Sequence, residues 1–438
     1  MTENKRIGVI SLGCDKNRVD TEKMLAVLKG KHQLVNDIAT AQIIIINTCA
    51  FLQSSREEAI GEILSAGEFK KAGNAEKIIV TGCLPQKFVS EIFEELPEVD
   101  AFMGVSDYDK ILQVIDEIYL NQRLNAVGNP STEKTTKRVL TTKNYAYLKI
   151  ADGCSNHCTY CLIPYIRGKY RSVDKYSLIK EAKSLGNVKE LILVAQDVTR
   201  YGKDLKNPSN LVELIRELSA LDNVGSIRLL YCYPEKINDE LIQELKTNPK
   251  LIKYIDIPLQ HADDGVLKLM NRKGTGQGYL DLIKILKEEV DGIAIRSTFI
   301  TGFPRESESA FLNLVEFIKR AQLFNCGFFK YSREEGTPAY KLDGQIDSKT
   351  ANARLRKLYS VQKKIVKENL KKLLGKTVKV LAEGFDEDRL VYYGRAYFNA
   401  PDIDGKIYFF SGEETVYGEY YDVEIGEVSD YDLYGERV

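Results

Sequence analysis

Short apolar runs rich in β-branched residues alternate with amphipathic segments along most of the chain, and this alternation constrains the fold more than any other feature. Near the N-terminus the runs are IGVISLGC, IIIINTCAF and KIIVTGC, at residues 7–14, 43–51 and 77–83. Parallel strands covered by helices on both faces have this composition. Between them, DTEKMLAVLKG predicts a helix that is capped by Asp20 and ends at Gly30. We predict a doubly wound α/β domain at this end of the chain.

A second alternation begins at Tyr145, after the polar stretch GNPSTEKTTKRVLTTKN, which predicts a linker. Six strand-like runs follow, separated by amphipathic helical segments: YAYLKIA, ELILVAQD, SIRLLYCY, YIDIPLQ, IAIRSTFITGF and CGFFKYS. Six such units predict a partial or complete parallel β/α barrel, in which functional residues lie at the C-terminal ends of the strands. A long charged helix around residues 350–374 is expected to close this part.

The pattern changes in residues 376–438, where tyrosines and short alternating runs predict a small antiparallel β-barrel of the oligonucleotide-binding type. This segment carries six Lys or Arg against fifteen Asp or Glu, whereas the preceding residues carry 56 against 48. An acidic surface repels nucleic acid and attracts a basic protein, unless its charge serves only solubility. We therefore divide the chain into residues 1–127, a linker at 128–144, a barrel with its trailing helix at 145–375, and 376–438.

The hydropathy and the cysteine content of the chain indicate the cellular compartment that we expect. The chain contains no long apolar run that would predict a secretory signal or a membrane helix, so we expect a cytoplasmic protein with no membrane contact. The eight cysteines are poor disulfide candidates in a reducing compartment. Clustered cysteines there more often bind metal or do chemistry.

Three cysteines, the barrel triad, fall in the stretch DGCSNHCTYCLIPYIRG: Cys154, Cys158 and Cys161. Their spacing would fit one helix face, but the surrounding Gly, Ser, Asn and Pro favour a loop, which can wrap three thiolates around one metal centre. Zinc with His157 as a fourth ligand is one interpretation, although structural zinc sites usually draw ligands from two knuckles. An iron-sulfur cluster on three cysteines leaves one iron open to a ligand that is not protein, and we favour it.

Three further cysteines, the N-terminal triad, each follow the last apolar residues of a predicted strand: Cys14, Cys49 and Cys83. Because the carboxyl ends of parallel strands meet at one edge of a sheet, we expect these thiols to lie together. Packing as small buried hydrophobic residues is the other interpretation. The remaining two, Cys232 and Cys326, lie within strand-like runs without partners, and we assign both to the core.

The barrel triad, spaced Cys-x3-Cys-x2-Cys after the first barrel strand, resembles the radical S-adenosylmethionine superfamily. The resemblance narrows to the methylthiotransferases, whose motifs it matches in order over essentially the whole chain: SLGCDKNRVDTEKML, INTCAF, VTGCLPQ, KIADGCSNHCTYCLIPYIRG, VAQDVTRYG, PLQHADDGVLKLMNR, GFPRESESAF and EEGTPAY. It implies a cysteine-bearing N-terminal domain, a radical barrel and a C-terminal barrel called TRAM. It also implies two 4Fe-4S clusters, one on each triad, with S-adenosylmethionine on the open iron of the barrel cluster.

The mechanism that this resemblance implies is a radical one. The barrel cluster would cleave S-adenosylmethionine to methionine and a 5'-deoxyadenosyl radical, which removes hydrogen from an unactivated carbon. The second cluster would hold the methylated sulfur that is then transferred. We therefore assign no catalytic role to a protein acid or base, because the cofactor carries the difficult chemistry. An electron donor such as a flavodoxin or ferredoxin is an expected partner.

Two branches of the family differ in substrate. One modifies adenosine in transfer RNA, where the turn after the first strand more typically has glutamine and methionine. The other modifies the β-carbon of an aspartate in the twelfth protein of the small ribosomal subunit, and SLGCDKN, YCYPEKINDELI and GRAYFNAPDIDGKIYFF resemble it. The acidic C-terminal segment also favours a basic ribosomal protein as partner, with direct nucleic acid binding at most secondary. A non-catalytic RNA-binding protein with structural zinc is the alternative from another class.

Further cofactor contacts are expected at the ends of two barrel strands. Gln196 and Asp197 follow the second strand, and Gly302 and Pro304 follow the fifth. Each of these residues could instead serve the local turn. His261 ends the fourth strand, where a lone histidine is more often structural than catalytic.

Two residues depart from the family pattern. Asp15 stands where proline is usual, and Arg305 stands where glycine is usual, in a loop that the family places beside the cofactor. Arg167, in the motif YIRG, is expected to meet a carboxylate of cofactor or substrate, or to cap its loop.

Overall fold

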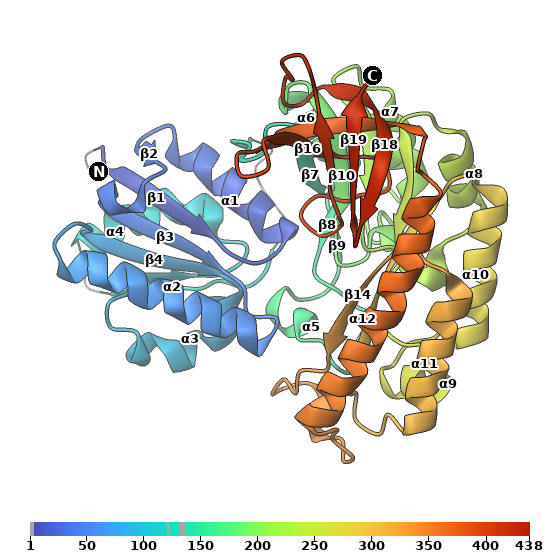
Figure 1. Cartoon of the computed structure of the whole chain (residues 1–438). Coiled ribbons are helices and arrows are strands. Elements are labelled where there is room, and N and C mark those ends of the chain that lie inside the picture. Colours follow the sequence, from blue (N-terminus) through green and yellow to red (C-terminus); the bar gives the residue numbers. More distant parts are fainter. Residues whose placement is uncertain (1–3, 121–122, 132–136) are drawn as a thin grey trace.

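The computed structural model describes residues 4–120, 123–131 and 137–438. A six-stranded parallel sheet in the order β2-β1-β3-β4-β5-β6 forms its N-terminal unit (Figure 1). Its strands are β1 (Arg6–Ser11), β2 (Gln33–Val35), β3 (Ile43–Thr48), β4 (Lys77–Gly82), β5 (Ala101–Met103) and β6 (Leu124–Ala126). Its helices are α1 (Asp15–Leu28), α2 (Gln53–Lys71), α3 (Cys83–Glu95) and α4 (Ile111–Leu120). The predicted doubly wound α/β unit is confirmed.

Strand β3 shows why an unbroken isoleucine run forms the middle of this sheet. Ile43 and Ile45 pack with residues of α1 and α4 on one face, whereas Ile44 and Ile46 pack with residues of α2 and α3 on the other. All four side chains are fully buried. Because successive strand residues point to opposite faces, a strand covered by helices on both sides must be apolar throughout.

A second parallel sheet, in the order β7-β10-β11-β12-β13-β14, forms an open partial barrel, as predicted. Its strands are β7 (Tyr145–Lys149), β10 (Val188–Val194), β11 (Val224–Leu229), β12 (Leu251–Asp256), β13 (Ala294–Thr301) and β14 (Asn325–Lys330). A small antiparallel pair, β8 (Ala151–Asp152) with β9 (Arg171–Ser172), follows β7. The helices are α5 (Ile163–Ile166), α6 (Lys175–Ser184), α7 (Leu211–Ser219), α8 (Asp239–Thr247), α9 (Asp264–Leu269), α10 (Gly276–Glu289), α11 (Glu308–Ala321) and α12 (Ser348–Lys371).

The C-terminal unit is a closed five-stranded barrel in the order β15-β16-β17-β19-β18. Its strands are β15 (Thr377–Asp386), β16 (Val391–Arg395), β17 (Ile407–Phe410), β18 (Tyr420–Ser429) and β19 (Asp432–Arg437). The predicted small barrel is confirmed, but β17 and β19 pair in parallel, and all other neighbours pair antiparallel as expected. Strand β19 follows β18 after a short turn.

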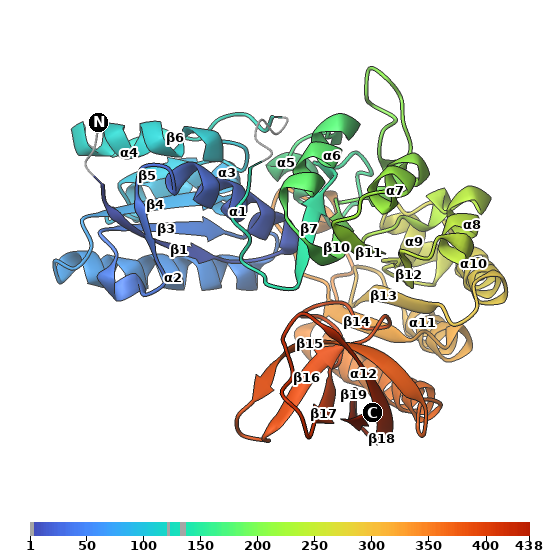
Figure 2. The same ribbon diagram turned by 90° about the horizontal axis from the view of Figure 1, so that it is seen from above.

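The closed barrel packs against one face of the partial barrel (Figure 2). Tyr147 and Tyr254 of the parallel sheet share a core with Phe398 and other residues of the C-terminal unit. A buried carboxylate, Glu190, joins the two units: it pairs with Arg228 of the sheet at 2.5 Å and with Arg395 of strand β16. The opposite face of the sheet is covered by its own helices.

Helix α1 begins earlier than the sequence predicted. It starts at Asp15, with Cys14 as its N-cap, and Asp20 lies inside it. Asp20 resembles a cap in the sequence, but in the structure it is buried and pairs with Lys149 of strand β7. A cap preference is local, and here a partner from another unit outweighs it. Among the described residues, no helix combines the length and the apolar character needed to cross a membrane.

Candidate functional site: two cysteine triads at a shared interface

The N-terminal triad gathers at the carboxyl edge of the first sheet. Cys14 caps helix α1, Cys49 follows strand β3, and Cys83 begins helix α3. The sulfurs of Cys14 and Cys83 lie 4.0 and 3.9 Å from one atom, the amide oxygen of Asn17. A Cβ at Gly13 would lie 2.6 Å from the Cβ of Cys49, so glycine is needed there. The structure therefore brings together three cysteines that are far apart in the sequence.

Burial raises the pKa of two of these thiols. It raises the pKa of Cys83 to about 12, although the nearby Arg167 guanidinium opposes it. It also raises the pKa of Cys49, and the charge of Cys14 adds to that effect. Buried thiols of this kind bind as thiolates when a metal replaces their protons. The donor set therefore suits a metal centre that lies beside an arginine.

The barrel triad lies in a loop that leaves and returns through the β8–β9 pair. The backbone N–H of Cys154 donates to the carbonyl of Gly168 over 3.0 Å, and that of Cys161 donates to the carbonyl of Cys158 over 3.1 Å. A Cβ at Gly153, whose φ is +72°, would lie 2.2 Å from a backbone oxygen, so the loop requires glycine there. Burial raises the pKa of Cys161, and the charge of Cys158 raises it further. These three thiols also lie within electrostatic reach of one another.

The zinc interpretation gains no support from this geometry. His157 is exposed, has a φ of +53°, and binds Asn271 only through its backbone carbonyl. Within the described ranges, no three His, Cys, Asp or Glu side chains converge closely enough to hold a single metal ion.

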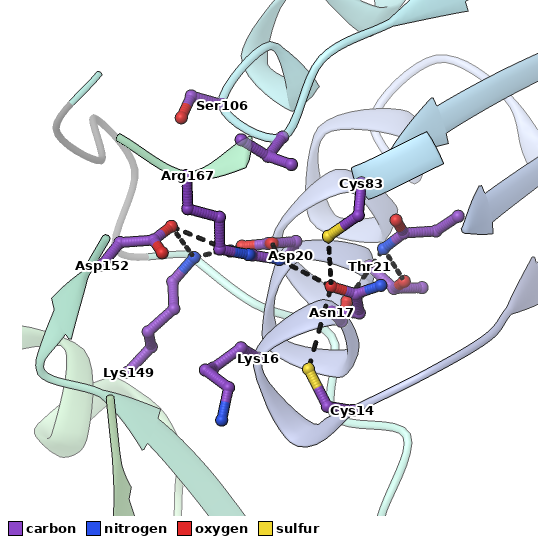
Figure 3. Close-up of polar contacts among 12 residues, drawn as sticks. Cys14, Lys16, Asn17, Asp20, Thr21, Cys83, Ser106, Lys149, Asp152 and Arg167 are labelled. Atoms are coloured by element: carbon purple, nitrogen blue, oxygen red, sulfur yellow. Dashed lines mark hydrogen bonds and ion pairs between the residues drawn. The ribbon is translucent and has the colours of Figure 1, made fainter. Parts of the chain in front are cut away.

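Arg167 lies beside the N-terminal triad, between helix α1 and the barrel (Figure 3). It follows helix α5, shortly after the last cysteine of the barrel triad, and it is fully buried. Its guanidinium donates over 2.6 Å to the oxygen of Asn17 that lies beside the N-terminal triad. It also pairs with Asp152 at 2.9 Å and with Asp20 of helix α1 at 3.2 Å. The carboxylates that Arg167 meets thus belong to the protein itself.

A second cation shares these carboxylates. Lys149, at the end of strand β7, pairs with Asp20 and lies 3.4 Å from Asp152. Burial would raise the pKa of Asp152, but the charges of Arg167 and Lys149 hold it well below its usual range. Asp152 therefore remains charged inside the interface between the N-terminal unit and the barrel.

Two other buried pairs fix the N-terminal unit on the barrel. Arg138 joins Glu22 of helix α1 to Glu181 of helix α6, the latter at 2.9 Å. Arg138 belongs to the stretch predicted as a linker, so part of that stretch makes a buried contact. Glu334, in the loop after strand β14, pairs with Arg56 near the start of helix α2 at 2.6 Å. Helix α2 begins just after Cys49, so this pair also positions the N-terminal triad.

The first two predicted cofactor contacts differ in their surroundings. Gln196 donates to Asp152 over 3.3 Å, and its buried Oε1 has no hydrogen-bond partner among the described residues. Asp197 is fully buried, accepts a hydrogen bond from Asn156 of the barrel-triad loop over 3.0 Å and pairs with Lys236. Gln196 thus retains an unfilled acceptor near the barrel triad, whereas Asp197 anchors the loop.

The other two predicted contacts lie in the turn after strand β13. Gly302 has a φ of +75°, and a Cβ there would lie 2.8 Å from that of Ala351 in helix α12. Its N–H donates to the buried carboxylate of Glu306 over 2.6 Å. His261 lies 3.0 Å from the same carboxylate, as expected of a structural histidine, and Pro304 is buried beside them. A cofactor contact by Gly302 or Pro304 stays a prediction.

Arg305 lies at the surface of this turn. It has a φ of +63°, a conformation in which glycine is favoured, and this explains why glycine suits the position. Its side chain is 52% exposed and pairs with Asp343. The substitution therefore adds backbone strain without placing a charge in the interior.

Arg272 is a functional candidate that the sequence analysis missed. It is buried, stacks on the ring of Tyr233 at 4.0 Å, and has an Nε with no hydrogen-bond partner among the described residues. Burial lowers its pKa, but the neighbouring Tyr160, Tyr233 and Cys158 raise it, so it stays cationic beside the barrel triad. It ends the motif PLQHADDGVLKLMNR and follows helix α9, away from the strand ends at which functional residues were expected. The unfilled groups of Gln196 and Arg272 fit a polar ligand at this triad.

Three family models match successive parts of the chain. "Uncharacterized protein family UPF0004" matches residues 6–104, "Radical SAM superfamily" matches residues 148–318, and "TRAM domain" matches residues 374–438. Their order is that of the three units in the structure.

Solved structures resemble the fold at low sequence identity. The radical S-adenosylmethionine methyltransferase TsrM from Kitasatospora setae, with cobalamin and a [4Fe-4S] cluster bound, has a TM-score of 0.58 at 12% identity over 77% of each chain. The cobalamin-dependent S-adenosylmethionine radical enzyme OxsB has a TM-score of 0.53 at 12% identity, over 84% of this chain and 62% of that one. These likenesses show the fold alone.

Curated relatives match along the whole chain. The "Ribosomal protein uS12 methylthiotransferase RimO" of Acetivibrio thermocellus is 47% identical, over 99% of this chain and 98% of that protein. A protein of the same name from Clostridium kluyveri is 46% identical, over 98% of this chain and 97% of that protein. The chain belongs to the RimO family of methylthiotransferases, within the radical S-adenosylmethionine superfamily.

Proposed function

We propose that the chain inserts a methylthio group at the β-carbon of an aspartate in ribosomal protein uS12. The observation that carries the proposal is the pair of cysteine triads, one in each unit, with Arg167 joining Asn17 beside the N-terminal triad to Asp152, two residues before the barrel triad. Two separate thiol-rich sites at one interface suit a reaction that needs a radical at one place and a sulfur donor at another. The names of the relatives favour uS12 over transfer RNA as substrate.

Each triad would hold one 4Fe-4S cluster with one open iron, and the barrel cluster would take S-adenosylmethionine there. When bound, the barrel cluster and S-adenosylmethionine supply the radical chemistry that removes hydrogen from an unactivated carbon, which no protein acid or base achieves. Gln196 offers an acceptor, and Arg272 a donor, beside this triad. We assign them to the amino and carboxylate groups of S-adenosylmethionine, respectively.

The protein itself fixes the two sites relative to each other. Buried pairs at Arg167, Lys149, Arg138 and Glu334 hold helices α1 and α2, and so the N-terminal triad, against the barrel. Positioning of reacting groups at this level contributes several kcal/mol to catalysis in general, of the order of 7–11 kcal/mol in well-oriented systems. Burial of the interface also keeps water from reactive species.

The closed barrel supplies the surface for a basic partner. Four acidic residues, all exposed, lie on its neighbouring strands β18 and β19: Asp422, Glu424, Glu427 and Glu436. They would attract a ribosomal protein rich in Lys and Arg and would repel a free polyanion. A flavodoxin- or ferredoxin-type electron donor remains a further expected partner.

Mass spectrometry tests the proposal. Anaerobically reconstituted enzyme is incubated with S-adenosylmethionine, a reductant, and either uS12 or unmodified transfer RNA. We expect a methylthio gain on an aspartate of uS12. A gain on adenosine alone would refute the assigned substrate and retain the chemistry.

A triple variant separates the roles of the two triads. Replacing Cys14, Cys49 and Cys83 by alanine should leave S-adenosylmethionine cleavage but abolish sulfur insertion. Cys232→Ala, at a buried cysteine outside both triads, is the matched control and should retain both activities. Sulfur insertion by the triple variant would contradict the assignment of the N-terminal triad.

A further inference from the structure

The proposed reaction requires a group at the interface that binds the carboxylate of the substrate aspartate. In an aspartate side chain, the carboxylate is bonded directly to the β-carbon, so a group that holds the carboxylate must lie close to the place of sulfur transfer. A buried carboxylate needs a cation with hydrogen-bond donors to spare. Such a cation must have N–H donors that are not already bonded to other groups of the protein.

Most cations at this interface already pair with carboxylates of the protein. Arg167 serves Asp20, Asp152 and Asn17, and Lys149 shares the same two carboxylates. Other cations of the barrel have neighbours of their own: Lys236 pairs with Asp197, Arg296 pairs with Asp256 and Asp404, and Arg272 stacks on Tyr233 near Cys158.

Lys16 differs from these cations because it lies beside the N-terminal triad. It is two residues from Cys14, in the first turn of helix α1, and lies on the side of that helix that faces strand β7 (Figure 3). Its side chain is only 9% exposed. Its ammonium has one carboxylate partner among the described residues, Asp15 at 3.1 Å, and lies 3.6 Å from the ring centre of Tyr231. An ammonium carries three N–H donors, so its donor capacity is only partly used.

The neighbouring Asp15 also has an unused polar atom. Its side chain is 6% exposed, one oxygen accepts from the hydroxyl of Tyr231 over 3.3 Å, and the other, Oδ2, is buried with no partner among the described residues. Most buried polar atoms in proteins have a hydrogen-bond partner, so Oδ2 of Asp15 is available to a donor. A donor and an acceptor therefore stand side by side, both unfilled, next to Cys14.

Tyr231 places these groups between the two triads. It follows the end of strand β11 in a left-handed conformation, with a φ of +62°, and its backbone N–H is held by Asp256 over 3.0 Å. Its hydroxyl reaches Asp15 beside the N-terminal triad. Two residues later, Tyr233 lies within electrostatic reach of Cys158 of the barrel triad. This strained segment therefore passes from one triad to the other, and strain of this kind is common at functional sites.

We propose that Lys16 binds the carboxylate of the aspartate that is modified, with Asp15 accepting a hydrogen bond from a donor next to that carboxylate, such as the backbone N–H of the same residue. This inference rests on the proposed function, because it requires an aspartate substrate. It gives the N-terminal unit a role in recognising the substrate as well as in supplying sulfur.

A binding cycle tests the charge recognition without using activity. The dissociation constant of anaerobic holoenzyme is measured for uS12 and for uS12 with its target aspartate replaced by asparagine. Wild-type enzyme should prefer the aspartate form by roughly 10- to 100-fold, the range for a hydrogen bond to a charged group. Lys16→Met, which keeps the length and apolar stem of the side chain, should bind the two forms about equally.

The control is Lys29→Met, which removes the same charge at the exposed end of helix α1 and should keep the wild-type preference. A general structural role for Lys16 predicts instead that the Lys16→Met enzyme binds both forms more weakly by the same factor, and that result would overturn the inference. So would an unchanged preference in the Lys16→Met enzyme. If wild-type enzyme binds neither form, uS12 is not the substrate, and the proposed function fails together with this inference.

Discussion

Replacing Arg167 by methionine should destabilise the contact between the N-terminal unit and the barrel. Methionine keeps the apolar stem and approximate volume of the side chain, so the main loss is that of the charge and its hydrogen bonds. The substitution leaves Asp20 and Asp152, both buried, with Lys149 as their shared cation. Removing one partner of a buried ion pair costs about 3–5 kcal/mol. Because Lys149 remains, we expect a loss of about 3 kcal/mol in the free energy of unfolding.

Urea unfolding of the protein without metal, followed by far-UV circular dichroism, measures this loss. Arg18→Met is the matched control, since Arg18 also lies on helix α1 and pairs across units with Asp402, but at 3.7 Å and with 37% of its side chain exposed. Exposed pairs of this kind contribute less than about 1 kcal/mol. If Arg167→Met lost no more stability than Arg18→Met, the view of Arg167 as a buried connection between the N-terminal unit and the barrel would be wrong.

Three other predictions concern stability. Glu190→Gln leaves two buried arginines without their shared carboxylate and should lower the free energy of unfolding by about 3 kcal/mol in denaturant titrations. Arg305→Gly should raise the melting temperature slightly, because glycine relieves a left-handed backbone conformation at a cost of only one exposed ion pair. Partial burial would raise the pKa of Glu76, but hydrogen bonds, first among them that from Lys5, lower it to about 2. This folded-state pKa is below that of the unfolded chain. The stability advantage of wild type over Glu76→Gln should therefore be complete at pH 7 and disappear as the pH falls from about 4.5 to 2. An advantage that grew over this interval would contradict the assignment.

The strands and the grouping of the cysteines within each triad could be predicted because both follow from local rules. A run such as Ile43–Ile46 is apolar on both faces. Only a strand that is covered on both sides buries all four side chains. Parallel strands end at one edge, so cysteines placed after three strands of one sheet meet there. The three cysteines of the barrel triad are close in sequence, and a loop rich in turn residues needs no distant information to bring them together.

The polar interface could not be predicted in the same way. Asp20 was predicted to cap helix α1, and in the structure it lies inside that helix, where it and most of its polar neighbours are buried. Charged residues are buried only where partners meet them, and those partners, Lys149 and Arg167, lie more than a hundred residues away in the chain. The local preference of aspartate for helix caps therefore predicted that α1 starts at Asp20, five residues after its actual start at Asp15.

The sequence by itself determined three units, their strand patterns and the two sets of three cysteines, because hydrophobic periodicity and spacing are properties of neighbouring residues. Only the tertiary structure decided that Arg167 joins Asn17 beside the N-terminal triad to Asp152 of the barrel, that the closed barrel packs against the parallel sheet through Glu190, and that Lys16 has unused donors beside Cys14. The physical reason is that the free energy of a buried charge depends on every group around it, and those groups are brought together by the fold and not by the order of the chain.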